Sequence, residues 1–175
     1  SNETGTAYIV KDSVTVINLA SITSAADNNF NSATIRTANT NTNLALTGLV
    51  DGTYKVYSVD AAGNLSSVST NSVIVDTTVP TSLALSTAAI SSSITGTNSN
   101  IATISATDAN SITYALATGN GTNDANNSSF NISGTSLRTS SSLTAGTYNI
   151  YVSATDAAGN VSYQTFSIVV SSGPT

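Results

Sequence analysis

An internal repeat constrains the fold of this chain more than any other feature. Residues 48–67 (GLVDGTYKVYSVDAAGNLSS) match residues 142–163 (SLTAGTYNIYVSATDAAGNVSY), and their Gly-Thr-Tyr triplets begin at Gly52 and Gly146, 94 residues apart. A period of that length fits one β-sandwich domain per repeat, since such domains have about 100 residues. The 175-residue chain is therefore predicted to hold two tandem domains.

Proline marks the linker between the repeats. Pro80 ends the stretch VDTTVP, and Pro174 follows at the same interval of 94 residues. Proline has no N–H to give to a β-ladder and keeps the preceding residue extended, so it is typical of a segment between sheets. We expect a first domain over residues 1–76 and a second over residues 77–175.

Composition and alternation indicate an all-β fold of two tandem immunoglobulin-like, Greek-key β-sandwiches. The chain has no Cys, Trp, Met or His and is rich in Ser, Thr and Asn, which suits strands and turns more than helices. In the second repeat, alternating apolar residues predict seven strands, the number of an immunoglobulin-like sandwich. These are 82–90, 100–107, 111–117, 129–133, 136–140, 147–155 and 161–170.

The first repeat matches only the later part of such a sandwich. Residues 5–10 (GTAYIV) align with residues 111–116 (SITYAL), the third strand of the second repeat, because both have a tyrosine at the fourth position. We therefore expect the first sandwich to lack its first two strands within this sequence. Its open edge is expected to be covered by a partner or by strand exchange with another copy. The expected strands are 5–10, 13–19, 33–37, 43–48, 53–59 and 65–75.

Tyr54 and Tyr148 stand early in the sixth strand of each repeat. This is the position of a tyrosine corner, in which the hydroxyl group bonds the backbone of the preceding crossover. Alternation along residues 147–155 also predicts one face toward the core and one toward solvent. The residues predicted to point inward are Tyr148, Ile150, Val152 and Ala154.

Acidic residues fall where strands of one sandwich end together. In a seven-strand sandwich the loops after the second and sixth strands lie at the end where the chain comes in. Asp108 and Asp156 follow those strands, and Asp76 lies in the linker. Ca²⁺ takes about 6 to 8 oxygen ligands, and without a cation such charges repel one another. We predict a calcium-stiffened hinge held by Asp76, Asp108 and Asp156, with Asp51 and Asn110 as further ligands.

A second, incomplete calcium site is expected near the beginning of the chain. Glu3 precedes GTAYIV as Asp108 precedes SITYAL, and Asp60 is the counterpart of Asp156. Plain turn chemistry is the alternative for all of these acids, because Asp and Asn cap turns and Gly supplies a positive φ. Both interpretations stay open at this point.

These motifs resemble a known family, the tandem immunoglobulin-like and cadherin-like repeats of large secreted bacterial surface adhesins, as in the extender region of RTX-type adhesins. The linker VDTTVPT and the closing GTYKVYSVDAAGNLSS resemble bacterial Ig-like repeats, and YNIYVSATDAAGNVSYQTFSIVV resembles a bacterial cadherin-like domain. The resemblance implies that Asp76, Asp108 and Asp156 match linker, second-loop and sixth-loop calcium ligands. It implies an extracellular, cell-surface rod that projects a distal binding region in adhesion or biofilm formation, with neighbouring repeats of the same polypeptide as partners.

Other functional classes fit the sequence less well. Nine acidic residues against four basic ones give a net charge of −5, which disfavours nucleic acid and anionic membranes as partners. Because His and Cys are absent, there is no Ser-His or Cys-His nucleophile and no imidazole or thiolate zinc set, so we do not expect an enzyme. A Lys-Asn isopeptide crosslink through Lys11 or Lys55 is an option for the first domain only. A glycan- or protein-binding module of a secreted protein remains the alternative function, with residues 118–130 as a polar binding loop.

Overall fold

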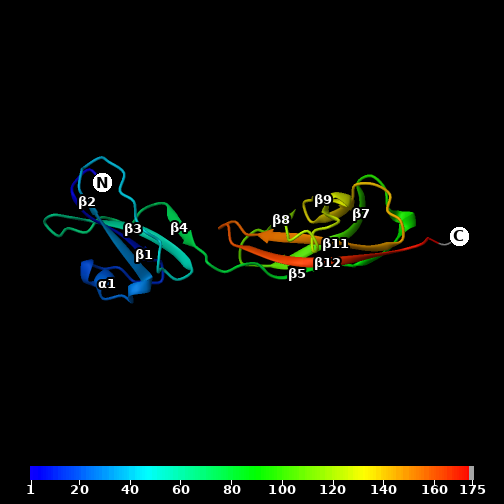
Figure 1. The fold of residues 1–175 in the computed structure, drawn as a ribbon. Coiled ribbons are helices and arrows are strands. Elements are labelled where there is room, and N and C mark those ends of the chain that lie inside the picture. Colours follow the sequence, from blue (N-terminus) through cyan, green and yellow to red (C-terminus); the bar gives the residue numbers. More distant parts are fainter. Residues whose placement is uncertain (174–175) are drawn as a thin grey trace. The chain divides into compact units, whose positions relative to one another are not determined.

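The computed structural model describes residues 1–173, so Pro174 and Thr175, the last residues of the predicted second domain, lie outside the described residues. The chain divides into two units, Ser1–Thr77 and a second that begins at Thr78. Strands dominate both units, as Figure 1 shows. The all-β class predicted from the sequence is confirmed.

The second unit is an immunoglobulin-like sandwich of two four-stranded sheets. Their strand orders are β5-β7-β10-β9 and β6-β12-β11-β8. Every strand predicted for this unit is present, within a few residues at its ends. The bounds are β5 Thr81–Leu85, β6 Ala89–Ser91, β7 Ser99–Thr107, β8 Thr113–Leu116, β9 Phe130–Ser133, β10 Ser136–Thr139, β11 Gly146–Thr155 and β12 Val161–Ser171, with 3-10 turns η2 Ser92–Ile94 and η3 Asn127–Ser129.

The segment predicted as one strand over 82–90 divides between the two sheets. β5 pairs antiparallel with β7, whereas β6 pairs parallel with β12. Ser86 lies at the change of sheet, where its N–H donates to the carbonyl of Thr103 and its Oγ accepts the N–H of Thr103, both at 2.9 Å. The segment thus supplies an edge strand to both sheets, which covers the two ends of the core.

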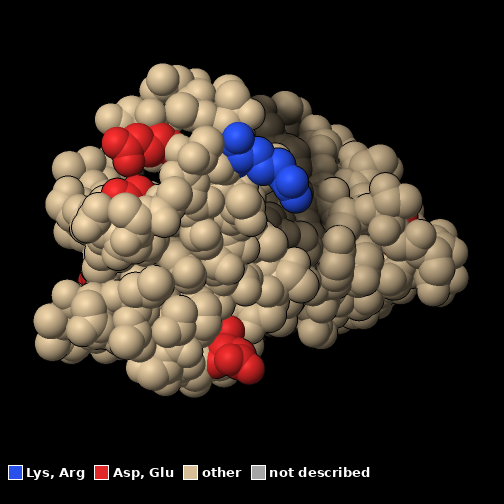
Figure 2. Space-filling view, turned by 90° about the vertical axis from the view of Figure 1, so that its left-hand side faces the viewer, with Lys and Arg blue, Asp and Glu red and all other residues tan. Residues whose placement is uncertain are grey.

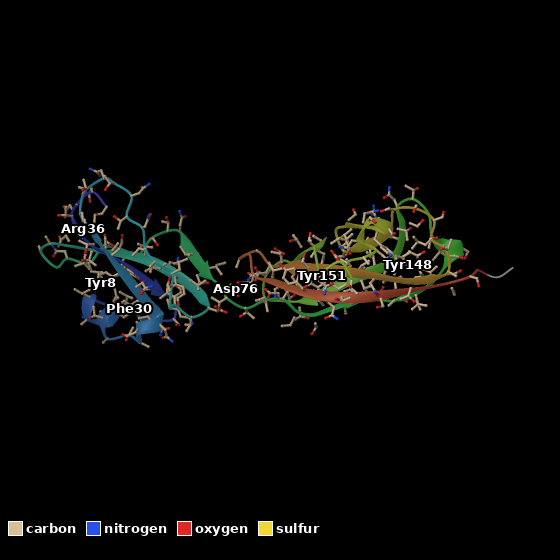
Figure 3. All side chains as sticks on the ribbon, in the orientation of Figure 1. Tyr8, Phe30, Arg36, Asp76, Tyr148 and Tyr151 are labelled. Atoms are coloured by element: carbon tan, nitrogen blue, oxygen red, sulfur yellow. The ribbon has the colours of Figure 1, made fainter. Side chains whose placement is uncertain are left out.

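The core of the second unit lies between the two sheets. Ile150, Val152 and Ala154 of β11 are fully buried, as their alternation predicts. Tyr148, which lies at the start of β11 in Figure 3, is half-buried and meets Phe130 edge to face at 6.1 Å between ring centroids. The inward face is therefore confirmed, although Ser153 on the opposite face is also buried.

The first unit is a single antiparallel sheet in the order β2-β1-β3-β4. Three of its strands correspond to β8, β11 and β12, because β1 and β4 flank β3 as β8 and β12 flank β11. Within residues 1–77 there is no second sheet to cover this one. The bounds are β1 Gly5–Lys11, β2 Phe30–Ile35, β3 Gly52–Asp60 and β4 Ser72–Val75, with helix α1 Leu19–Thr23 and 3-10 turn η1 Asp27–Asn29.

Two of the strands predicted for the first unit, 13–19 and 43–48, are absent, so these predictions are wrong. Residues 13–19 turn and begin α1, because Asn18 caps the helix: its Oδ1 accepts the N–H of Ser21 at 3.0 Å, and Ser21 returns a bond to the Asn18 N–H. Residues 43–48 have no strand to pair with, and Leu44 packs irregularly against the small core of Ile9 and Tyr54. Alternation alone did not separate these segments from true strands.

Among the described residues, no helix is long and apolar enough to cross a membrane.

The last expected strand of the first unit, 65–75, is regular only over β4. In residues 65–71, serine hydroxyl groups replace backbone carbonyls as acceptors for β3. The N–H of Val56 donates to Ser69 Oγ and that of Ser58 donates to Ser66 Oγ, both at 2.9 Å. The strand expected at 33–37 is β2, which begins earlier, at Phe30. Short polar side chains that bond the backbone compete with sheet pairing, which explains the irregular segment.

Both tyrosine corners are confirmed. The hydroxyl group of Tyr54 donates to the carbonyl of Val50 at 2.6 Å, and that of Tyr148 donates to the carbonyl of Thr144 at 3.0 Å. Each bond ties the crossover to the start of the next strand, so both units keep the same corner although only the second has two sheets.

Candidate metal centre

The DAAGN turn after β11 holds Asp156 in a closed set of hydrogen bonds. Asp156 Oδ1 accepts the backbone N–H groups of Ala158 and Asn160, and Oδ2 accepts the side-chain amide of Asn160, all at 2.8 Å. Gly159 has a φ of +94° and closes the turn in the left-handed region. These bonds hold the Asp156 carboxylate in one orientation, as a metal ligand requires.

Asp156 is nearly buried and ionised. Only 6% of its surface is exposed. Burial raises its pKa, but hydrogen bonds from the side chain and backbone of Asn160, then from Gly159 and Ala158, outweigh burial and hold the pKa of Asp156 below its usual value. A charge held this far from water favours a bound counter-ion.

Asp108 reaches the same end of the second unit from another strand. It follows β7, and its Oδ1 accepts the N–H of Asn110 at 2.8 Å in a turn of its own. Thr155, the residue before Asp156, pairs with Thr113 at the start of β8. Carboxylate oxygens of Asp108 and Asp156 lie within 4.8 Å of one another. Two oxygens at this separation can share one cation.

The first unit contains the same turn with a different surrounding. Asp60 Oδ1 accepts the N–H groups of Ala62 and Asn64, and Oδ2 accepts the Asn64 side-chain amide, at 2.8 to 2.9 Å. The Asn64 side chain, then its backbone N–H, lowers the pKa of Asp60. Glu3 and Asp60 line one shared hollow of about 220 Å³. The structure therefore brings these two acids together, but Asp60 is half-buried and Glu3 is exposed.

Asp51 and Asp76 belong to the end of the first unit where the chain leaves it. Asp51 Oδ1 accepts both the N–H and the hydroxyl group of Thr77, each at 2.8 Å. Asp76 follows β4 directly and is half-buried (Figure 3). Asp51 thus holds Thr77, the residue after Asp76, in place.

The turn interpretation named the asparagines as caps, but it did not predict how Asn64 and Asn160 bind the aspartate. Each asparagine closes its turn twice, through its backbone N–H and its side-chain amide. The signal was present, because Asn ends both copies of DAAGN. An Asx turn alone needs only the aspartate and its backbone partners. The bond from the asparagine side-chain amide to aspartate Oδ2 therefore could not be predicted from the turn motif.

The fold and site together define an all-β chain of two units, the second of which is an immunoglobulin-like sandwich with an acidic pair at one end. No protein-family model matches this chain, and no curated protein matches it. Among solved structures, Drosophila N-cadherin EC1-3 is similar at 19% identity and a TM-score of 0.43, covering 99% of this chain and 57% of that one. Drosophila N-cadherin EC1-4 is similar at 20% identity and a TM-score of 0.41, covering 79% of this chain and 36% of that one. The chain thus spans a third to just over half of those structures, and strand order, not these scores, carries the fold assignment.

Proposed function

We propose that this chain is a pair of calcium-stiffened extender repeats from a bacterial cell-surface adhesin. The observation that carries the proposal is the approach of the Asp108 and Asp156 carboxylates to within 4.8 Å, with Asp156 nearly buried and ionised. Like charges so close are unfavourable unless a cation lies between them. The proposed role is mechanical and includes no catalytic step.

Calcium suits the ligands better than a transition metal. The chain has no His or Cys, and a set of carboxylate, amide and carbonyl oxygens is what Ca²⁺ binds. Asn110 stands two residues after Asp108 and supplies a side-chain oxygen from the same loop. Together with water, these groups approach the coordination number of about 6 to 8 that Ca²⁺ requires.

Asp76 is proposed as the linker ligand on grounds of chain connectivity. It lies five residues before Thr81, and Thr81 pairs with Thr107, the neighbour of Asp108. Five residues span at most about 18 Å, so the linker is tethered at the acidic end of the second unit. A bound ion that includes Asp76 stiffens the connection between repeats.

The first unit is proposed to hold a weaker site through Glu3 and Asp60. The pair shares a hollow, but greater exposure leaves both acids better hydrated and lowers the gain from a cation. Asp51 is the least favoured ligand, because Thr77 already takes one of its oxygens twice.

Tandem repetition supports the extender role, and so does the low share of charged residues, 7% of the chain. Figure 2 shows acidic and basic side chains as isolated spots among uncharged residues on the face in view. We propose an extracellular location, where calcium is plentiful, with neighbouring repeats as the main partners. Homotypic contact or strand exchange is proposed at β4, since its outer edge pairs with no strand in residues 1–77 and Ile74 is 64% exposed.

A binding module for glycans or proteins is the second candidate. Tyr151 and Tyr163 stack on the outer face of β11 and β12, with ring centroids 5.4 Å apart and planes at 14°, and Tyr163 is 53% exposed. Exposed aromatic rings favour sugar or protein contact. Specific binding in a glycan array that is lost in Tyr163→Ser would support this role over that of a spacer.

Isothermal titration of the metal-free chain with Ca²⁺ tests the main proposal. We expect one tighter site that Asp108→Asn removes, since this change keeps an acceptor for the Asn110 N–H and deletes the charge. Asp12→Asn is the matched control, because Asp12 is exposed and outside both acidic pairs; it should leave the titration unchanged. No calcium heat in the parent chain, or equal binding in Asp108→Asn, would refute the metal centre.

A further inference from the structure

The loop between β8 and η3 contains the sequence's single Asn-Gly dipeptide, Asn120-Gly121. Both residues are exposed. Glycine after asparagine has no side chain to obstruct its own nitrogen, and a Cβ added to Gly121 would meet nothing within 4 Å. A side chain at position 121 therefore does not hinder attack by this backbone nitrogen, whose N–H is bonded to Asp124.

The carbonyl of the Asn120 side chain is polarised by two backbone donors. Asn120 Oδ1 accepts the N–H of Thr122 at 3.0 Å and that of Asn123 at 3.1 Å. A pair of N–H groups on one carbonyl oxygen is the arrangement that stabilises an oxyanion when a nucleophile attacks the carbon. The electrophile, Asn120 Cγ, is thus activated by the fold of the loop.

The nucleophile is in contact with a base. The N–H of Gly121 donates to Asp124 Oδ1 at 2.7 Å, and Gly119 donates to Asp124 Oδ2 at 2.8 Å. The Gly119 bond, followed by that of Gly121, holds the pKa of Asp124 below its usual value despite some desolvation, so Asp124 is a carboxylate at neutral pH. It is placed to accept the Gly121 proton.

We propose that Asn120 is a site of spontaneous deamidation through a cyclic imide formed with Gly121. The Gly121 nitrogen bonds to Asn120 Cγ while its proton passes to Asp124. The same proton is relayed to the side-chain nitrogen, and the Cγ–N bond breaks to release ammonia. Water then adds to one of the two imide carbonyls and opens the ring, leaving aspartate or isoaspartate at position 120.

The modification changes how the loop supports the sandwich. The residues that follow bond the part of the β11 edge that β8 does not pair: Asn126 Oδ1 accepts the N–H of Asn149 at 2.8 Å, and Asn127 Oδ1 accepts that of Tyr151 at 3.0 Å. A new carboxylate at position 120 repels Asp124, and isoaspartate also lengthens the backbone within the turn. Both products loosen the loop that protects this edge.

Peptide mapping by mass spectrometry tests the proposal on the full chain. Folded protein and protein unfolded in urea are incubated side by side at 37 °C and neutral pH, and the exchange of amide nitrogen for oxygen is followed at each asparagine. We expect Asn120 to react first, ahead of Asn-Ser sites such as Asn110, where a side chain follows the asparagine. We also expect the folded chain to react at Asn120 at least as fast as the unfolded chain.

Slower reaction at Asn120 in the folded chain than in urea would overturn the proposal, because the loop would then protect the residue. Asn120→Gln is the negative control, since a glutamine cannot form the same five-membered imide. Asp124→Asn should slow the reaction about a hundredfold or more; an unchanged rate would rule out Asp124 as the base. If that variant disturbs the loop, the comparison of folded with unfolded parent chain still decides the claim.

Discussion

At the scale of single residues, two tyrosines make the same hydrogen bond but differ in how far their side chains are buried. Tyr54 is fully buried, and its hydroxyl group contacts the carbonyls of Val50 at 2.6 Å and Asn28 at 3.3 Å. Burial, then the charge of Asp51, raises the pKa of Tyr54, so it stays a neutral donor. Tyr148 is half-buried and bonds Thr144. The corner therefore contributes more to the first unit, which has the smaller core.

Phenylalanine substitutions test this difference. Tyr54→Phe should destabilise the first unit by about 1 to 2 kcal/mol, because it removes the tyrosine donor to the half-buried Val50 carbonyl, and Tyr148→Phe should cost the second unit about 0.5 to 1 kcal/mol. Hydrogen exchange of each unit's peptides across a urea series separates the two transitions. Equal losses in the two variants would contradict the assignment.

The pKa of Asp124 predicts a response of its loop to acid. Because the folded-state pKa lies below the unfolded value of about 3.9, the carboxylate's contribution is fully present above that pH. It is lost as the pH falls from there through the folded pKa. The Gly119 and Gly121 amides should lose protection from exchange below about pH 4, ahead of amides in β10. Unchanged protection of both glycines at pH 2 would disprove the prediction.

The sequence was informative about individual residues wherever the repeat could be aligned. Tyr54, Tyr148 and the equivalence of Asp60 with Asp156 follow from matching positions. The burial of these residues does not follow from the alignment, since Asp60 and Asp156 make the same hydrogen bonds but differ in exposure. That difference comes from segments outside the repeat, whose packing single residues do not reveal.

At the scale of elements, β4 and β12 show how far the two units differ. β4 pairs Val75 with Gly52, as β12 pairs Val170 with Gly146, so Val73 is the register equivalent of Ile168. Ile168 is 1% exposed between two sheets, whereas Val73 is 36% exposed. The same strand position is therefore core in one unit and surface in the other.

Alanine substitutions at this matched pair measure the difference. Ile168→Ala should cost the second unit about 2 to 5 kcal/mol, as expected for a buried cavity, and Val73→Ala should cost the first unit less than about 1 kcal/mol. Urea unfolding followed by exchange of each unit's peptides reports both. A large loss in Val73→Ala would mean that this face is covered in solution, as by a second copy.

Strand prediction succeeded where an alternating segment had a neighbour to pair with. All strands of the second unit were found, but residues 13–19 and 43–48 alternate without a ladder partner. Alternation states which side chains share a face and says nothing of whether a neighbouring strand exists. Local chemistry, such as the Asn18 cap and the serine bonds to β3, then decides the backbone.

At the scale of the whole molecule, the two units differ both in fold and in their acidic residues. The second unit is a complete sandwich and carries Asp108 and Asp156 at 4.8 Å or less; the first is a single sheet with a more exposed pair. A cation that binds the folded state alone stabilises it in proportion to ligand excess. Calcium is therefore predicted to stabilise the second unit more than the first.

Thermal melting of the full chain, with calcium and with a chelator, measures whether calcium stabilises the second unit. With calcium at about 100 times its Kd, the second unit should gain about 2.7 kcal/mol, or about 11 to 22 °C in Tm, and Asp108→Asn should abolish the gain. The Asp12→Asn variant should behave as the parent chain. Identical melting curves in calcium and chelator would contradict the account, because the Asp108–Asp156 pair would then be stable without a metal.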